Sequence, residues 1–156
     1  MIRDRPTGLS VPASVGRATA GDLRSLGAGW NFDWEDEARR SDVYKLLTEE
    51  DPGANLGLVA VDLREGFVEI TLLECSPGNV GREKRFEGIA GSMIAFAAGL
   101  SFDTGCEGYV AMESKTNLID HYCRTYGLER IGMSHRLFLA RDAATRLVRQ
   151  YLGKEI

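Results

Sequence analysis

Residues 85–93 read RFEGIAGSM, and this stretch decides how the rest of the chain is interpreted. Arg85 stands three residues before Gly88, and residues 89–100 continue as an apolar run with helical spacing. The first turn of a helix has unpaired N–H groups and a partial positive charge, and glycines there let an anion approach the backbone. With the adjacent Lys84, the stretch predicts a phosphate-binding helix start. A glycine-rich helix entry without any ligand explains the spacing equally well.

Length and composition predict one compact domain, residues 1–156, with residues 1–14 as a loose leader or an irregular edge strand. The net charge of −4 argues against a nucleic-acid-binding protein, because no basic stripe is present. The cysteines form no CxxC pair and suit a reducing compartment. No signal peptide, membrane span or metal-ligand spacing is found. We therefore expect a cytoplasmic protein without metal, membrane or nucleic-acid partners.

Hydrophobic patterns predict a mixed α/β order of elements. The predicted elements are a β-hairpin of strands 56–63 and 67–75, a helix at 88–100, a strand at 108–112, a helix at 117–126, a strand at 136–140 and a closing helix at 142–152. Gly127 follows the second helix where a left-handed C-terminal cap belongs.

Two segments of the N-terminal third allow alternative interpretations. Residues 43–47 suit either a strand or the end of a helix. Trp30 and Trp34, the two tryptophans, pack beneath a loop in one interpretation and line the mouth of a pocket in the other.

The order Arg85-x-x-Gly88-x-Ala90 resembles the signature of the GNAT superfamily of acetyl-CoA-dependent N-acyltransferases, which is Arg or Gln, two free positions, Gly, one free position, then Gly or Ala. The run 117–128, NLIDHYCRTYGL, is similar to the Asn, Tyr and Gly-apolar segment of that superfamily's fourth helix. The phrases LLECSP, AFAAGLSF and GYVA are similar to a bacterial branch of small stand-alone proteins. The resemblance covers residues 67–131 well and the N-terminal third weakly. It implies an α/β fold with a mixed, mostly antiparallel sheet, one splayed parallel strand pair and helices on both faces.

The resemblance also implies acetyl-CoA as the cofactor and assigns residues to it. The main chain near Leu73 and Cys75 would pair with the pantetheine arm, and Asn117 would hydrogen-bond near it. The pyrophosphate would be bound by backbone amides beside the Arg85 side chain, at Phe86, Gly88, Ile89, Ala90 and Gly91. Tyr122 would stand near the sulfur as the general acid. One departure is the seven-residue segment 78–84, which is longer than the corresponding link in the superfamily.

Glu69 and Glu74 are the candidate general bases on the central strand. Glu69 lies six residues before Cys75, a separation that resembles the catalytic glutamate of the histone-acetyltransferase branch. Glu74 is nearer along the chain, but in a regular strand it points to the opposite side from Cys75 unless a bulge intervenes. This favours Glu69, although either carboxylate suits a solvated face or a cross-strand pair.

The resemblance implies an N-acetyltransferase that moves the acetyl group of acetyl-CoA to a primary amine by direct attack. Two alternatives stay open: a non-catalytic acyl-CoA-binding or sensor module, and an interaction protein in which the glycine-rich turn is purely structural. The expected partner is an amine on a small molecule or a protein, and a homodimer is a further possibility.

Overall fold

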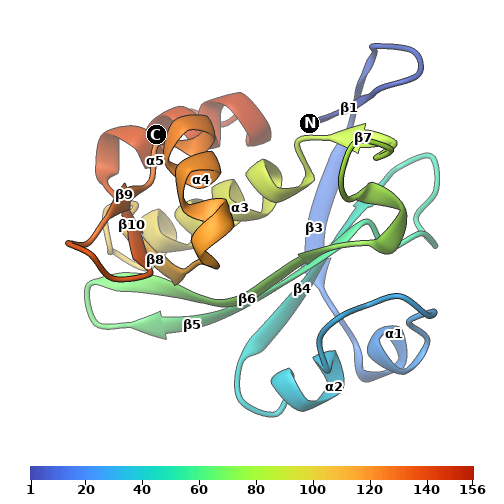
Figure 1. Ribbon diagram of the computed structural model, residues 1–156, viewed down its shortest axis with the longest axis horizontal. Coiled ribbons are helices and arrows are strands. Elements are labelled where there is room, and N and C mark those ends of the chain that lie inside the picture. Colours follow the sequence, from blue (N-terminus) through green and yellow to red (C-terminus); the bar gives the residue numbers. More distant parts are fainter. The chain divides into compact units, whose positions relative to one another are not determined.

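The computed structural model describes residues 1–156, which form two compact units. Unit 1 comprises Met1–Ala60 and Leu72–Met93, and unit 2 comprises Val61–Thr71 and Ile94–Ile156. Strands β5 (Gly57–Arg64) and β6 (Phe67–Cys75) and helix α3 (Ile89–Asp103) contribute residues to both units (Figure 1). The strand pairs are mostly antiparallel, and β6 with β8 (Val110–Glu113) is a parallel pair. The predicted mixed α/β fold class is confirmed, while the single domain stays a prediction.

Unit 1 contains the strand order β3-β4-β5-β6, with β3 at Ala13–Arg17 and β4 at Asp42–Thr48. The segment that suited a strand or a helix end is therefore a strand. Helices α1 (Ala20–Arg24) and α2 (Trp34–Glu37) pack on this sheet. Their apolar cluster contains Leu23, Trp34, Val43, Leu58 and Ala60.

Strand β5 is buried on both of its faces within unit 1, since Gly57 to Ala60 are all buried. Leu58 and Ala60 face the α1–α2 cluster. Gly57 points the other way, as alternation along a strand requires. A Cβ on Gly57 would lie 2.9 Å from both Ile89 Cγ2 and Met93 Cε, so the missing side chain lets the first turn of α3 approach the strand closely.

A second, three-stranded sheet in unit 1 has the order β2-β1-β7, with β1 at Ile2–Asp4, β2 at Ser10–Val11 and β7 at Phe86–Glu87. Residues 2–11 form an edge hairpin, so of the two alternatives for residues 1–14 the structure agrees with an edge strand and not with a loose leader. Ile2 is buried, and Arg3 forms an ion pair with Glu87 of β7. Strands of two and three residues have too little periodicity for the sequence pattern to show them.

Unit 2 contains the strand order β5-β6-β8-β10-β9, with β10 at Arg136–Leu139 and β9 at Glu129–Arg130. The helical segments are the rest of α3, the 3-10 turn η2 (Thr116–Leu118), α4 (Ile119–Tyr126), α5 (Arg141–Leu147) and the π-helical turn η3 (Val148–Leu152). Alternate residues of the strands are buried, among them Val68, Ile70, Val110, Leu137 and Leu139. Their neighbours Glu69, Glu113 and Arg136 stand on the opposite face.

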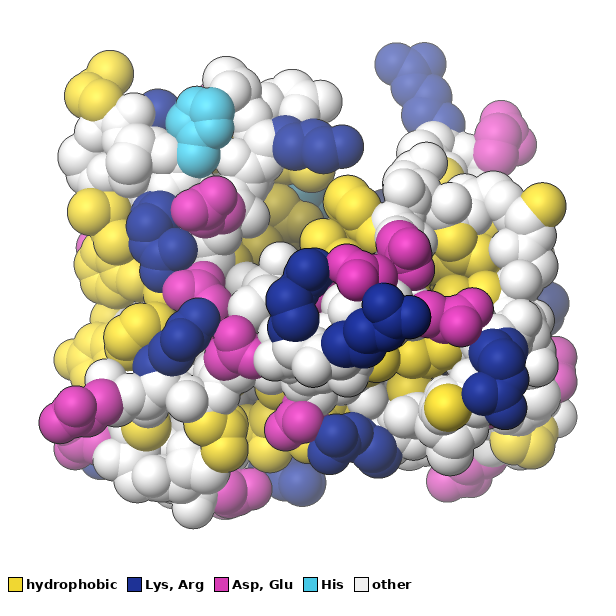
Figure 2. Space-filling view, turned by 90° about the horizontal axis from the view of Figure 1, so that it is seen from below, with side chains coloured by type: hydrophobic (Ala, Val, Ile, Leu, Met, Phe, Trp, Pro, Cys, Tyr) yellow, Lys and Arg dark blue, Asp and Glu magenta, His cyan; other side chains and the backbone are white.

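The predicted hairpin, the three helices and the two later strands are present. Gly127 caps α4 with a φ of 77°, and its N–H donates to the Cys123 carbonyl at 3.1 Å, as predicted. None of the helices is both long and apolar enough to cross a bilayer. On the face drawn in Figure 2, acidic and basic side chains are interspersed, without a broad field of either sign.

Asp22 makes the stability of the folded protein depend on pH. Its carboxylate bonds Lys45 Nζ at 2.8 Å and accepts the Thr19 N–H at 2.8 Å, in a capping box at the start of α1. The Lys45 contact, followed by the Thr19 N–H, lowers the pKa of Asp22 to about 2. A carboxylate whose pKa is lower in the folded state stabilises the protein at pH values above its pKa in the unfolded state. This contribution is lost as the pH falls through its pKa in the folded state.

We expect Asp22→Asn to flatten the acid dependence of stability between about pH 4 and pH 2. At pH 5 the variant should be less stable than the wild type, and the difference should shrink toward pH 2. Urea unfolding at pH 5, 3 and 2 measures this. A wild-type-minus-variant difference that stays constant over the three pH values would contradict the assignment.

Candidate functional site

Strand β6 has an unpaired edge in unit 1. Its parallel ladder with β8 joins Val68, Glu69 and Ile70 to residues 110–112 and ends there, whereas β6 continues to Cys75. On the other edge β5 is the neighbour, and the Ser76 N–H donates to the Leu56 carbonyl at 2.9 Å. Residues 72–75 therefore have no strand partner on this edge, and the pairing predicted for Leu73 and Cys75 with a ligand stays a prediction.

The long segment after β6 is a closed loop held by Asn79. This buried residue ends the 3-10 turn η1 (Pro77–Asn79). Its Nδ2 donates to Ser76 Oγ at 2.7 Å, and its Oδ1 accepts the Phe86 N–H at 3.1 Å. The side chain therefore joins both ends of the loop. Asn79 was not among the predicted site residues, because a single Asn after Pro-Gly signals only a turn.

The N-terminal hairpin holds the same loop from outside. The Arg5 N–H donates to the Arg85 carbonyl at 2.9 Å, and the Arg5 guanidinium donates to the Lys84 carbonyl at 3.0 Å and to the Arg82 carbonyl. Arg5 and Arg3 also form ion pairs with Glu87. The segment that leads into α3 is thus held at residues 82, 84, 85 and 87.

Helix α3 begins directly after Gly88, which has a φ of 95°. This left-handed conformation suits glycine and turns the chain from β7 into the helix. The first intrahelical bond closes from the Ser92 N–H to the Gly88 carbonyl at 2.9 Å. The N–H groups of the turn before Ser92 have no intrahelical acceptor, so they form the anion-attracting end of a fifteen-residue helix.

Cys75 lies against this helix start. Burial raises the pKa of its thiol to about 11, while the positive charge of Lys84 and the N–H of Ala90 act in the opposite direction. A thiol with so high a pKa is protonated near neutrality and is a poor nucleophile.

Arg85, predicted to lie beside a phosphate, is engaged elsewhere. Its Nε is 3.4 Å from Asp4 Oδ1, and its guanidinium carbon lies 4.8 Å from the centre of the Phe86 ring. The side chain is exposed and paired with the N-terminal strand.

Glu74, the second candidate base, is a buried anchor for the segment between α1 and α2. Its Oε2 accepts the Asn31 N–H at 2.6 Å, and its Oε1 accepts the Trp34 indole N–H at 2.8 Å and the Phe32 N–H at 3.4 Å. Both carboxylate oxygens are therefore occupied.

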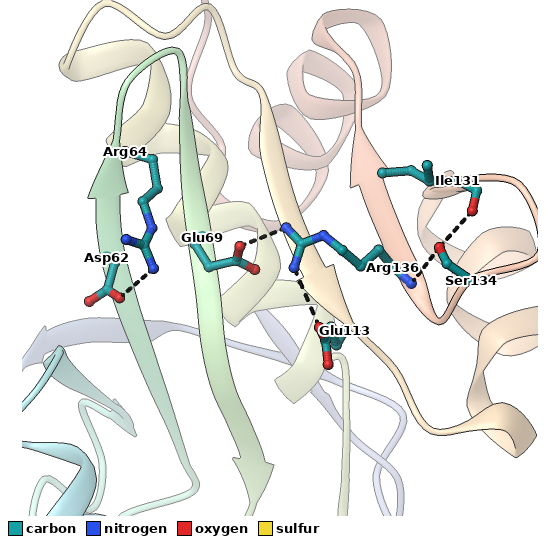
Figure 3. Close-up of polar contacts among 7 residues, drawn as sticks. All are labelled: Asp62, Arg64, Glu69, Glu113, Ile131, Ser134 and Arg136. Carbon is teal, nitrogen blue, oxygen red and sulfur yellow. Dashed lines mark hydrogen bonds and ion pairs between the residues drawn. The ribbon is translucent and has the colours of Figure 1, made fainter.

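Glu69, the favoured candidate, lies on the polar face of unit 2 and is bound to Arg136. One guanidinium nitrogen of Arg136 is 2.7 Å from Glu69 Oε1, and the other is 3.7 Å from Glu113 Oε1 (Figure 3). The Glu69 hydrogen bond is the first cause of a raised Arg136 pKa. Only one oxygen of Glu69 is used by this pair, and its side chain keeps 12% exposure.

Tyr122 and Asn117 belong to unit 2. Tyr122 is buried on α4, with its ring centre 5.9 Å from those of both Tyr126 and His121. Asn117 is exposed within η2. The roles predicted for Tyr122 and Asn117 depend on a cofactor bound at unit 1, so they stay predictions.

Unit 1 also has an open cavity of about 660 Å³ beside α1. Its lining includes Trp30, Leu26, Leu47, Asp22, Lys45 and Asn55. Trp30 therefore lines a pocket, whereas Trp34 is 1% exposed in the core. The interpretation as a pocket-mouth residue therefore holds for Trp30, and the interpretation as a packed residue holds for Trp34.

Comparisons with known proteins agree with this architecture. No protein-family profile and no curated protein sequence matches the chain. Solved structures do match. A mutant AtaT toxin bound to the C-terminus of the antitoxin AtaR and acetyl-CoA aligns with a TM-score of 0.59 at 14% identity, over 86% of this chain and 97% of that one. The chain has the GNAT fold.

Two further GNAT-fold structures show the same likeness. The ribosomal-protein-S18-alanine N-acetyltransferase of Escherichia coli aligns with a TM-score of 0.56 at 9% identity, over 81% of this chain and 91% of that one. A Bacillus anthracis protein described as a streptothricin acetyltransferase, in complex with acetyl coenzyme A, has a TM-score of 0.59 at 10% identity, over 83% and 98%. At these identities the likeness establishes the fold.

Proposed function

We propose that this GNAT-fold protein is an N-acetyltransferase that binds acetyl-CoA where β6, loop 78–84 and α3 meet and transfers the acetyl group to a primary amine. The observation that carries the proposal is the start of α3. There Gly88 at positive φ, the Asn79-closed loop and first-turn N–H groups that lack an intrahelical acceptor come together in unit 1. The acetyl-CoA complexes of two structures with the same fold support it.

The groups at this junction fit the cofactor. The N–H groups of the first turn of α3 suit a pyrophosphate, and only small side chains, Ala90 and Gly91, follow Ile89 there. The unpaired edge of residues 72–75 suits the amide groups of the pantetheine arm. When bound, acetyl-CoA would supply a thioester that is electrophilic at its carbonyl carbon.

Glu69 is the better of the two candidate bases. Its Oε2 has no partner and is able to accept the proton of an attacking amine, whereas both oxygens of Glu74 hold the 31–34 segment. Backbone N–H groups on the unpaired edge of β6 would stabilise the oxyanion, and the Tyr122 phenol would donate a proton to the departing thiolate. We propose a small-molecule or protein amine as the acceptor, and a cytoplasmic location.

A second candidate function is an acyl-CoA-binding module without turnover. It is favoured by one observation: both candidate bases already have strong partners, Arg136 for Glu69 and three donors for Glu74. Release of CoA thiol from acetyl-CoA in the presence of a panel of primary amines separates the two functions. Binding without thiol release for any amine supports the module.

Ala90→Glu tests the cradle without disturbing the helix. A carboxylate in the first turn favours the helix dipole, so the variant should be at least as stable as the wild type. The same charge about 5 Å from a phosphate opposes binding by about 3 kcal/mol at an effective dielectric constant of about 20. We expect CoA affinity, measured by calorimetry, to fall on the order of a hundredfold.

Ala90→Gln is the matched control, because it has the same shape without the charge. It should retain most of the affinity and the thermal stability. If Ala90→Glu is folded and binds CoA as tightly as Ala90→Gln, the phosphates of CoA do not lie at the start of α3.

A further inference from the structure

Arg136 is at the centre of a charged cluster on the polar face of the unit 2 sheet. The cluster joins Glu69 of β6, Glu113 of β8 and Arg136 of β10, which are three adjacent strands (Figure 3). The strand register pairs Arg136 with Glu113 and Glu69 with Ala111, so these four side chains share one face. Arg136 therefore reaches across β8 to Glu69, and the short side chain of Ala111 leaves room for it.

The backbone of Arg136 is held by the turn that precedes β10. Its N–H donates to Ser134 Oγ at 3.2 Å, and its carbonyl accepts the Ile131 N–H at 3.0 Å. Ser134 Oγ in turn donates to the Ile131 carbonyl at 2.6 Å (Figure 3). The Arg130 guanidinium closes the turn through the carbonyls of Ser134, at 2.8 Å, and Met133, at 3.1 Å. The position from which the Arg136 side chain extends is thus fixed.

The Arg136 guanidinium is shared unequally between two carboxylates. It lies 2.7 Å from Glu69 Oε1 and 3.7 Å from Glu113 Oε1. The Glu69 side chain is 12% exposed and that of Glu113 is 73% exposed, so the shorter contact is also the one less weakened by solvent. With two carboxylates and one guanidinium, the cluster keeps a net negative charge. Arg136 therefore orients Glu69 without cancelling the charge of the cluster.

We propose that Arg136 is a positioning residue for the general base: by holding Glu69 Oε1 it fixes the carboxylate with Oε2 free to accept a proton. The inference rests on the proposed acetyl transfer, in which Glu69 is the base. In that step the attacking nitrogen gives its proton to Oε2 as it bonds to the thioester carbon, and the electron pair of the C–S bond departs with the sulfur. A base held in one orientation is more effective than one that rotates freely. The ion pair is then part of a working site.

The matched pair Arg136→Ala and Arg64→Ala tests the proposal. Arg64 is an exposed cation on β5 that pairs with Asp62 at 3.2 Å (Figure 3). We expect Arg136→Ala to lower kcat for a primary amine by about tenfold or more, with the amine KM changed by less than about threefold. Arg64→Ala should lower kcat by less than about twofold. Both variants should bind CoA as the wild type does, measured by calorimetry.

A double-variant cycle and rescue separate positioning from a general structural effect. In a Glu69→Gln background, Arg136→Ala should cause no further loss of kcat, because the two residues act as a unit. Arg136→Lys, which keeps the charge and a donor, should retain more activity than Arg136→Ala. Added guanidinium ion should raise the kcat of Arg136→Ala and leave that of the double variant unchanged.

Side-chain ¹³C relaxation of Glu69, measured without cofactor, gives a readout besides turnover. We expect Glu69 to become more mobile in Arg136→Ala and to stay as in the wild type in Arg64→Ala. Additive losses in the cycle, no rescue by guanidinium, or unchanged Glu69 mobility in Arg136→Ala would overturn this inference while acetyl transfer by the wild type stands. A wild type that releases no CoA thiol with any amine would refute the proposed function, and the inference with it.

Discussion

Glu74→Ala should destabilise the protein by about 4 kcal/mol, because it leaves three donors without their acceptor. The Trp34 indole and the Asn31 and Phe32 amides all donate to this carboxylate, and Trp34 is in the core. An orphaned buried donor costs about 1–3 kcal/mol, and the lost side-chain volume adds to that. The expected loss is a large part of the roughly 5–15 kcal/mol stability of a typical domain. Urea unfolding measures it.

Two controls define the cause. Glu74→Gln keeps the shape of the side chain but turns an NH₂ group toward a donor. It should therefore lose about half as much stability as Glu74→Ala. Glu35→Ala, the same substitution at an exposed carboxylate, should change stability by about 0.5 kcal/mol or less. If Glu74→Ala costs no more than Glu35→Ala, Glu74 does not anchor the 31–34 segment and is again a candidate for a free base.

Gly108→Ala should destabilise unit 2 by about 3 kcal/mol. Gly108 has a φ of 89°, and a Cβ there would lie 2.6 Å from Phe102 Cζ and 2.8 Å from Ala144 Cβ. The left-handed conformation costs a residue with a Cβ about 1–2 kcal/mol, and overpacking adds about 1–3 kcal/mol. Phe102 is near the end of α3 and Ala144 belongs to α5, so the overlap would force these two helices away from residue 108.

Gly105→Ala is the matched control in the same connection. Gly105 has a φ of 80°, but a Cβ there would meet no atom within 4 Å. It should therefore show only the backbone cost, about 1 kcal/mol. Thermal or urea unfolding of both variants separates the two contributions. Equal losses would show that the close approach of Phe102 and Ala144 to residue 108 is not rigid.

The parts of the fold that could be predicted are those with strong local signals. The hairpin of β5 and β6 has two apolar runs with a glycine between them, and α3 has fifteen residues after a glycine-rich start. The cap at Gly127 was predictable because the left-handed conformation after a helix favours glycine, which has no Cβ.

The parts that could not be predicted depend on distant partners. Glu74 and Trp34 are 40 residues apart, and Arg3 and Glu87 are 84 apart. Nothing in the local pattern of either pair distinguishes an ion-pair or hydrogen-bond partner from a solvated side chain. The same holds for Arg136, because its contact with Glu69 depends on β6, β8 and β10 lying side by side.

The most direct test of the central claim is an amide NMR titration of the ¹⁵N-labelled protein with acetyl-CoA. We expect the largest shift changes from Lys84 to Gly91 and along residues 72–75, at roughly micromolar to millimolar ligand. Absence of any shift, or shifts confined to other segments while those amides stay unchanged, would contradict the assignment of this helix start as the acetyl-CoA site.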